Sequence, residues 1–292
     1  MAIIDATEPR RILPKIPAAL RSPFGIVGLA IISIWVIAAV LAPWIAPTDP
    51  LAQIFPRLQP PGQDTLLGTD AVGRDVFSRI IYGARISLPL SVLVVVSSMV
   101  VGTVAGAIAG YLGGVVDEVI MRIADVIFAF PTIILAMVIA AALGPSLANA
   151  FIAMLVVSWP AYARVARSLV IVARQNEYVI AGRLLGSGVF RSLRRDVLPN
   201  VISPVLVLAM LNVGTAILEF SGLSFLGLGA IPPTADWGAM VADGVQQFSS
   251  WWIALFPGIA ILSIVVAFNL VGDSFRDSLD PRTRNAIKTG MK

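Results

Sequence analysis

Residues 126–163 read VIFAFPTIILAMVIAAALGPSLANAFIAMLVVSWPAYA and contain no Asp, Glu, Lys or Arg. A helix needs about 20 mostly apolar residues to cross a bilayer, so this run is long enough for two crossings. The middle of the run is Leu-Gly-Pro-Ser at residues 143–146, which is typical of a turn. We therefore expect a tight hairpin between two membrane spans, at 120–143 and 147–164.

Four more uncharged runs lie on either side of this hairpin, at residues 22–48, 86–116, 197–218 and 244–272. Their lengths predict one span each. These spans are expected at 25–46, 86–110, 199–224 and 252–272. The chain of 292 residues is 58% hydrophobic and only 13% charged, where soluble domains have about 25% charged residues. The sequence therefore predicts an all-α polytopic membrane protein with six transmembrane helices. The first run is too long for a cleavable signal peptide.

The distribution of basic residues predicts the orientation. If the N-terminus is cytoplasmic, 17 of the 21 lysines and arginines lie inside, seven of them between Arg164 and Arg195. The four outside are Arg57, Arg74, Arg79 and Arg85, which share their loop with four aspartates. Positive charge is retained in the cytoplasm, so both termini are expected there. The net charge of +4 follows from this topology and indicates no nucleic-acid partner.

Several kinds of chemistry lack the residues that they need. The chain has no cysteine and no histidine, which removes thiol nucleophiles, imidazole bases and most transition-metal sites. It also has no Gly-x-x-x-x-Gly-Lys-Ser/Thr loop for a nucleotide. We expect no catalytic residue, no metal site and no cofactor in this chain. If ATP and Mg²⁺ drive the protein, partner subunits bind them.

An arginine-rich island at residues 177–200, EYVIAGRLLGSGVFRSLRRDVLPN, separates two predicted spans. It resembles the coupling loop of binding-protein-dependent ABC-importer permeases, whose pattern is Glu-Ala-Ala, three residues, Gly, nine residues and Ile-x-Leu-Pro. Residues 180–182 stand in the triplet, Gly186 follows at the family distance, and residues 196–199 close the pattern. Ile180 and Asp196 depart from the family residue types. The resemblance implies two short helices around a glycine turn.

In this family such a segment docks into a cleft of the ATPase subunit. The resemblance assigns that contact to Glu177, Tyr178, Ala181, Gly182, Arg183, Gly186, Leu198 and Pro199. We expect helix from the fourth span to about Leu185, a break at Gly186, a second helix from Val189 to about Asp196, and Pro199 in the first turn of the next span. A solvated loop with a glycine turn is the other interpretation.

Further blocks from about Leu66 to Arg282 are similar to the C-type permease of dipeptide, oligopeptide and nickel importers. They are LLGTDAVGRDVFSR at 66–79, GYLGG at 110–114, LSFLGLG at 223–229 and NLVGDSFRD at 269–277. The resemblance implies a type I importer core of five spans, like that of methionine permeases, plus one N-terminal span. The expected segments are a cytoplasmic lead-in (1–24), a first helix (25–46), an external loop (47–85), a transmembrane domain (86–272) with coupling loop 165–198, and a cytoplasmic tail (273–292).

The function implied is that of a permease subunit of the bacterial inner membrane. It would form the path of a peptide importer with a homologous B-type permease, two ATP-binding subunits and an external substrate-binding protein. Nickel chelates and glutathione remain alternative cargoes. A self-sufficient secondary transporter, from another class, would show internal repeats or helices broken around an ion site, and the sequence has no such repeat. An intramembrane enzyme, a third class, would need histidine, cysteine or clustered carboxylates on facing spans, and the sequence shows none of these.

Some residues have local interpretations. Glu219 lies about 30 Å of helix from Pro199, near the outer end of the fifth span. An acid at membrane depth marks a path or gate, so Glu219 either attracts a peptide amino terminus, locks an outer gate, or pairs with Arg74, Arg79 or Arg85. Arg122 is expected to pair with Glu118 and Asp125. Glycines at 102, 106 and 110 predict close helix packing.

Overall fold

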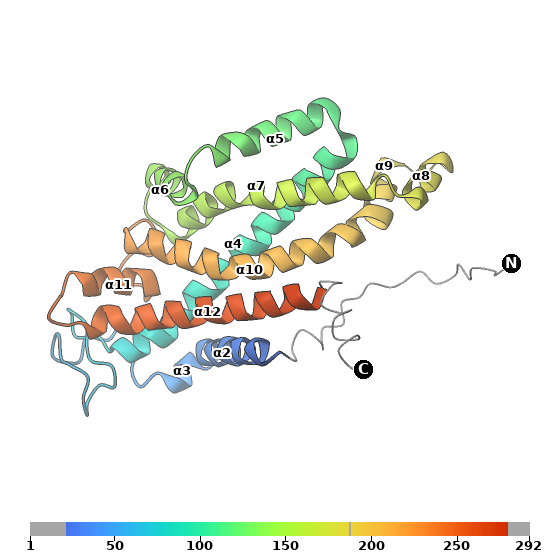
Figure 1. Cartoon of the computed structure of the whole chain (residues 1–292). Coiled ribbons are helices and arrows are strands. Elements are labelled where there is room, and N and C mark those ends of the chain that lie inside the picture. Colours follow the sequence, from blue (N-terminus) through green and yellow to red (C-terminus); the bar gives the residue numbers. More distant parts are fainter. Residues whose placement is uncertain (1–21, 187, 280–292) are drawn as a thin grey trace, which may run out of the picture.

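The computed structural model describes residues 22–279 except residue 187, and its regular elements in this part are helices. They are α2 (Pro23–Val40), α3 (Ala42–Ile45), α4 (Val76–Leu112), α5 (Gly114–Phe128), α6 (Thr132–Leu143), α7 (Leu147–Ala173), α8 (Glu177–Leu184), α9 (Val189–Ser192), the π-helix η1 (Leu193–Val197), α10 (Leu198–Phe225), α11 (Trp237–Val245) and α12 (Trp252–Leu279). The long helices cross the molecule side by side, with α8 at one end and α11 at the other (Figure 1).

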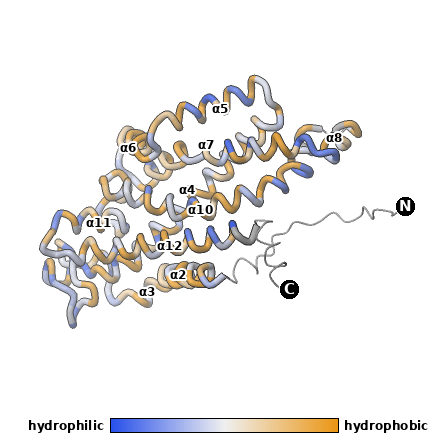
Figure 2. The backbone as a smooth tube through the Cα atoms, viewed as in Figure 1, coloured by the Kyte–Doolittle hydropathy of each residue, from blue (hydrophilic) through white to orange (hydrophobic). Residues whose placement is uncertain are grey.

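In the part of the chain that the structure describes, five segments are long and apolar enough to cross a membrane: α2, α4, α7, α10 with η1, and α12. Apolar residues cover most of their length (Figure 2). The predicted span at 120–143 is different. It consists of α5 and α6, which are bent by 91° at a short break and form either a sixth, broken span or a re-entrant loop. The break ends at Pro131, which precedes α6 and, as a proline, disfavours helical backbone in the residue before it. The all-helical membrane fold is thus confirmed.

Two helices extend beyond the predicted span ends, because charged residues do not end these helices. Helix α4 begins at Val76, ten residues before position 86, so the 47–85 loop is shorter than expected. Helix α7 continues to Ala173, past the predicted end at 164. Arg79, in α4, lies 3.6 Å from Asp70, and Arg164, in α7, lies 2.6 Å from Asp125. Paired charges can extend a helix beyond the apolar run from which its ends were predicted.

Helices α4 and α7 pack through the three glycines at spacing four. A Cβ on Gly106 would overlap the carbonyl oxygen of Ala163, and one on Gly102 would overlap that of Trp159. A Cβ on Gly110 would lie 2.7 Å from the Arg167 carbonyl oxygen. The two backbones therefore approach as only glycine permits, and the predicted close packing is confirmed.

The N-terminal helix α2 is fastened along α12. The indole Nε1 of Trp35 donates a hydrogen bond of 2.9 Å to Ser263 Oγ, and the hydroxyls of Ser22 and Ser274 lie 2.7 Å apart. Gly28 brings the backbones together, since a Cβ there would lie 2.6 Å from the carbonyl oxygen of Ala267. Polar contacts at both ends of α2 thus hold the additional span against the last one.

Candidate coupling and substrate-path sites

The segment after α7 forms a compact knob at one end of the molecule. Helix α7 ends at Ala173, so the expected continuous helix to Leu185 was wrong; a turn at 174–176 separates it from α8. Gly186 follows α8 with a φ of +83°, a conformation that glycine adopts without steric cost. After this turn, α9 and η1 run without interruption into α10. Pro199 lies in the first turn of α10, as expected.

The Tyr178 hydroxyl braces α8 against the start of α10. Asn200 Nδ2 donates to this hydroxyl at 3.0 Å and to the carbonyl oxygen of Asp196 at 2.9 Å. The Tyr178 hydroxyl in turn donates to the Asp196 carbonyl at 3.4 Å. That carbonyl belongs to η1, and π-helical turns are frequent at functional sites. Tyr178, expected from the resemblance to face an ATPase, therefore also has an internal role, which its pairing with Asn200 reveals.

One face of α8 is buried and the other is an exposed apolar tip. Val179 is fully buried, whereas Leu184 and Leu185 are 84% and 88% exposed. Ile180 is also exposed. Among the other residues that the resemblance assigned to this contact, Glu177, Ala181, Gly186 and Pro199 are exposed, and Gly182 and Leu198 are partly exposed. The side chain of Arg183 and residue 187 lie outside the described part of the chain. We call residues 177–192 the knob.

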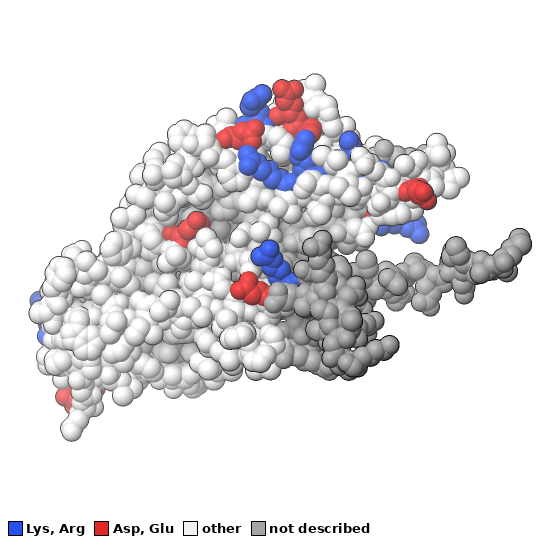
Figure 3. All heavy atoms as spheres, viewed as in Figure 1, with Lys and Arg blue, Asp and Glu red and all other residues white. Residues whose placement is uncertain are grey.

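Arginines of α7 fasten the neighbouring helices α4 and α5. Arg167 Nη2 donates to Asp117 Oδ2 at 2.5 Å, and Arg167 Nε contacts Asp117 Oδ1, which makes a bidentate ion pair. Arg174 Nη1 donates to the Gly110 carbonyl oxygen at 2.8 Å, at the end of α4. Charged side chains gather over α5, α7 and α8 in Figure 3, while most of that face is uncharged. These bonds make α4, α5 and α7 one braced unit beside the knob.

Asp125 also contributes to this brace, contrary to the expected pairing with Arg122. It accepts a hydrogen bond of 2.6 Å from Arg164 Nη2. The guanidinium of Arg164 lies 4.2 Å from the ring centroid of Phe128, a cation–π contact. Arg122 is paired with Glu118 alone, at 3.8 Å on an exposed surface. The prediction for Asp125 failed because spacing along one helix cannot show that Arg164 of α7 lies nearby.

Glu219 lines a cavity of about 130 Å³ between α4, α7, α10 and the α5–α6 break. Polar groups from three helices share it: Thr132, Ser158, Tyr162, Asn212 and Thr215. Asn212 Nδ2 donates to Tyr162 Oη at 3.1 Å. Glu219 makes no ion pair with any described residue, and Arg74 and Arg79 contact Asp70 instead. The alternative in which Glu219 pairs with Arg74, Arg79 or Arg85 is therefore not found among the described residues.

The 66–79 block, which the sequence offered only as a family signature, is a structural cap at the α11 end. Asp70 accepts from Arg74 Nε at 2.5 Å, and Asp75 caps α4 by accepting from the Ser78 amide. Trp252 Nε1 donates to the Thr69 carbonyl oxygen at 3.0 Å, which ties the loop to α12. These buried polar residues have partners within the fold, so they hold the loop in place.

A second set of bonds joins α11 to α4 under this cap. Asp236 precedes α11, accepts from Ser87 Oγ at 2.9 Å and caps the helix through the Ala239 amide. Burial raises the pKa of the Asp236 carboxyl above its ordinary value. Trp237 Nε1 donates to the Ile80 carbonyl oxygen at 2.9 Å. Asp236 and Trp237 thus anchor α11.

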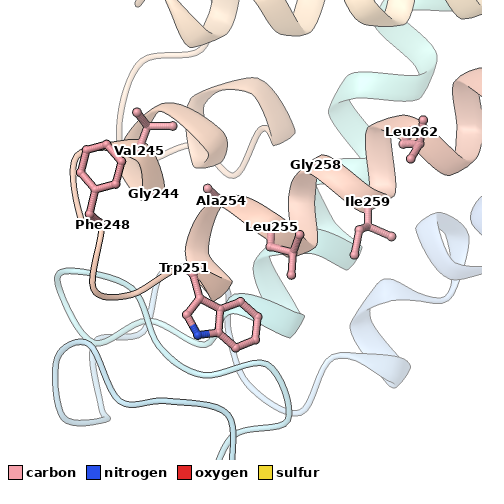
Figure 4. Close-up of a pocket in the computed structure, with 9 residues that line it drawn as sticks. All are labelled: Gly244, Val245, Phe248, Trp251, Ala254, Leu255, Gly258, Ile259 and Leu262. Atoms are coloured by element: carbon pink, nitrogen blue, oxygen red, sulfur yellow. The ribbon is translucent and has the colours of Figure 1, made fainter.

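A groove of about 580 Å³ lies between α11 and α12 and is apolar. Phe248 and Trp251 stand at one end of it, and Leu255, Ile259 and Leu262 follow along α12 (Figure 4). None of its lining residues is titratable. In a membrane protein such a surface suits lipid or another apolar chain, and it offers a polar substrate nothing to bind.

The comparisons with known proteins agree with this architecture. A family model described as "Binding-protein-dependent transport system inner membrane component" matches residues 102–285. Residues 20–61 match "N-terminal TM domain of oligopeptide transport permease C". The chain belongs to the binding-protein-dependent ABC-transport permeases. It is a C-type member of the peptide group, because the second match covers α2, the helix that precedes the shared core.

Curated relatives carry the same description along nearly the whole chain. The dipeptide transport system permease protein DppC of Escherichia coli K12 is 45% identical over 90% of this chain and 91% of its own length. DppC of Alkalihalophilus pseudofirmus is 43% identical over 91% of the chain and 88% of its own length. The di/tripeptide permease DppC of Pseudomonas aeruginosa is 43% identical over 89% and 88%. The permease is therefore a multi-pass membrane component of a transporter.

Asn212 and Thr215 belong to the Glu219 cavity, yet neither was singled out from the sequence. Their positions relative to Glu219 are seven and four residues earlier on α10, and residues at these spacings share one helix face. That spacing is the signal that could have found them. Nothing in the sequence could have placed Tyr162 beside them, because it comes from α7.

Within the described residues, no group of three or more His, Cys, Asp and Glu side chains could hold a metal ion. The Glu219 cavity contains a single carboxylate. The permease thus has an exposed knob, a braced unit next to it and a polar cavity among its long helices.

Proposed function

We propose that this permease imports di- and tripeptides as half of a translocation path, with a homologous B-type permease forming the other half. Two ATP-binding subunits would hold ATP and Mg²⁺ and receive the knob, and an external binding protein would deliver the peptide. The relatives are named as dipeptide and di/tripeptide permeases, which supports this cargo. Both termini and the knob would lie on the cytoplasmic side of the bacterial inner membrane, which the distribution of lysines and arginines supports.

The observation that carries the coupling role is the exposed apolar tip of α8 on a segment that is internally braced. Leu184 and Leu185 project beside the Gly186 turn, where a monomer gains nothing from their exposure. Exposed apolar residues on a polar segment are typical of an interaction site. The Tyr178–Asn200 contact would transmit a push on α8 directly to α10. A movement of the ATPase clefts would thereby reach the membrane helices.

Co-purification tests this docking. Leu184→Asp should reduce recovery of the ATP-binding subunits with the affinity-tagged permease by about tenfold, because burying one unpaired carboxylate costs a few kcal/mol. Phe248→Asp is the matched control, since Phe248 is 89% exposed and lies at the α11 end of the molecule. It should leave recovery of the ATP-binding subunits unchanged. Full recovery with Leu184→Asp, or equal loss with both variants, would refute docking through α8.

A further inference from the structure

The cavity at the α5–α6 break contains a carboxylate without a cation. No lysine or arginine lines it, and Glu219 has no ion pair within the described chain. A charged group at membrane depth is costly, and such groups face a cavity or bundle interior where they serve a path. Glu219 is half-buried on the cavity side of α10. The cavity therefore leaves this carboxylate free to pair with a positive group from outside the chain.

The cavity lies at depth within the membrane-crossing helices. Tyr162 and Asn212 lie near the middle of α7 and α10 respectively. Phe128 and Thr132, on either side of the α5–α6 break, also line it. Non-helical backbone at this depth is tolerated only where protein or a water-filled cavity surrounds it. The break thus opens the bundle next to Glu219.

We propose that this cavity binds the protonated amino terminus of the imported peptide, with Glu219 as its counter-ion; the assignment of a peptide rests on the function proposed above. An ammonium group has three donors. Besides the Glu219 carboxylate, the Thr215 hydroxyl lies one helical turn away on the same face. The Asn212 side-chain oxygen is also an acceptor, since the Asn212 amide nitrogen donates to Tyr162.

The size and charge of the cavity decide between ligands. About 130 Å³ holds an amino group with its Cα but only part of a dipeptide, because sites for whole small molecules have about 300 Å³ or more. The remainder of the peptide extends out of the cavity, toward the surface that the second permease would cover. A bare divalent cation would need several oxygen ligands with more than one charge, and the cavity has one carboxylate.

Thiol chemistry tests the charge of the cavity, because the chain has no cysteine. Thr215→Cys places one thiol in the cavity of the complete importer, assembled with cysteine-free partners. A cationic methanethiosulfonate reagent should modify this thiol about tenfold faster than an anionic one, owing to the nearby carboxylate. Adding Glu219→Gln should abolish that preference. Equal rates in Thr215→Cys, or a preference that survives Glu219→Gln, would overturn the proposal.

Peptide protection then tests the ligand. Alanylalanine at about twice its dissociation constant should slow modification of Thr215→Cys about threefold, whereas N-acetyl-alanylalanine should not. The free peptide should no longer protect when Glu219→Gln is added. Equal protection by both peptides would refute amine recognition. If vesicles with the unmodified importer take up no peptide, the proposed function fails, while the reagent preference still decides the charge of the cavity.

Discussion

Single glycines do two different things in this permease. At Gly102, Gly106 and Gly110, α4 contacts the backbone of α7, and a side chain at these positions would collide with it. At Gly186 no atom lies within 4 Å of where a Cβ would be, and only the backbone conformation matters. A substitution at Gly186 therefore tests the turn of the knob without a collision. Gly188 is equally open, but its φ lies outside the left-handed range from +20° to +160°.

Gly186→Val should uncouple transport, because a β-branched residue at positive φ costs about 1–3 kcal/mol and shifts the knob to another turn. The measurement is stimulation of ATPase activity by loaded binding protein in the reconstituted importer. Gly188→Val should retain that stimulation, and both variants should insert into the membrane. Wild-type stimulation in Gly186→Val would show that the turn at this residue is dispensable for coupling.

Helices α5 and α7 show how charged contacts position whole elements. Helix α5 lies along α7 (Figure 1), and the Asp117–Arg167 and Asp125–Arg164 pairs join the two. The Asp117–Arg167 pair is bidentate and partly buried, which favours a stable geometry. The Glu118–Arg122 pair lies within α5 itself. Both of its side chains are about 70% exposed, and the two charged groups are as far as 3.8 Å apart. The two pairs should therefore differ strongly in energy.

A double-mutant cycle measures this difference. The pair Asp117→Asn and Arg167→Gln should give an interaction free energy of about 1–2 kcal/mol, in the range of bonds to charged groups. The pair Glu118→Gln and Arg122→Gln should give roughly 0.5 kcal/mol or less. The readout is the free energy of unfolding of the detergent-solubilised permease. Equal interaction energies for the two pairs would mean that the α5–α7 contact is no brace.

Across the whole molecule, the two ends differ in chemistry. At the α8 end, Arg191 in the knob and Arg194 and Arg195 in η1 are exposed, whereas arginines at the α11 end such as Arg74 are paired within the cap. Each charge costs a few kcal/mol to place at the centre of the bilayer. The knob should therefore stay in the cytoplasm, and the 46–75 loop should face the outside.

Single cysteines test that topology without background. Leu185→Cys, at a highly exposed position, should resist a membrane-impermeant maleimide in intact cells and react in inverted vesicles. Gln63→Cys, exposed in the opposite loop, should show the reverse pattern. Modification of Leu185→Cys from outside intact cells would contradict both the orientation and docking to cytoplasmic ATPases.

The sequence by itself determined that this is a membrane protein, how many apolar segments it has, and that Gly102, Gly106 and Gly110 permit close helix packing. Each of these depends on composition or on spacing along one helix. Runs without charge predict spans, and glycines at spacing four predict close approach. The positive φ of Gly186 was also predictable, as only a break at glycine fits two short helices there. These are local properties, and a chain carries them before it folds.

Only the tertiary structure decided the partners of the charged and polar side chains. Asp125 pairs with Arg164, which is 39 residues away in the sequence, and not with Arg122, its neighbour along the helix. The same holds for Glu219, which lacks the predicted arginine and lies with Tyr162 and Asn212 in one cavity. The bend between α5 and α6 also emerged only in the fold. An ion pair or a cavity depends on which helices become neighbours, and packing between distant segments decides that.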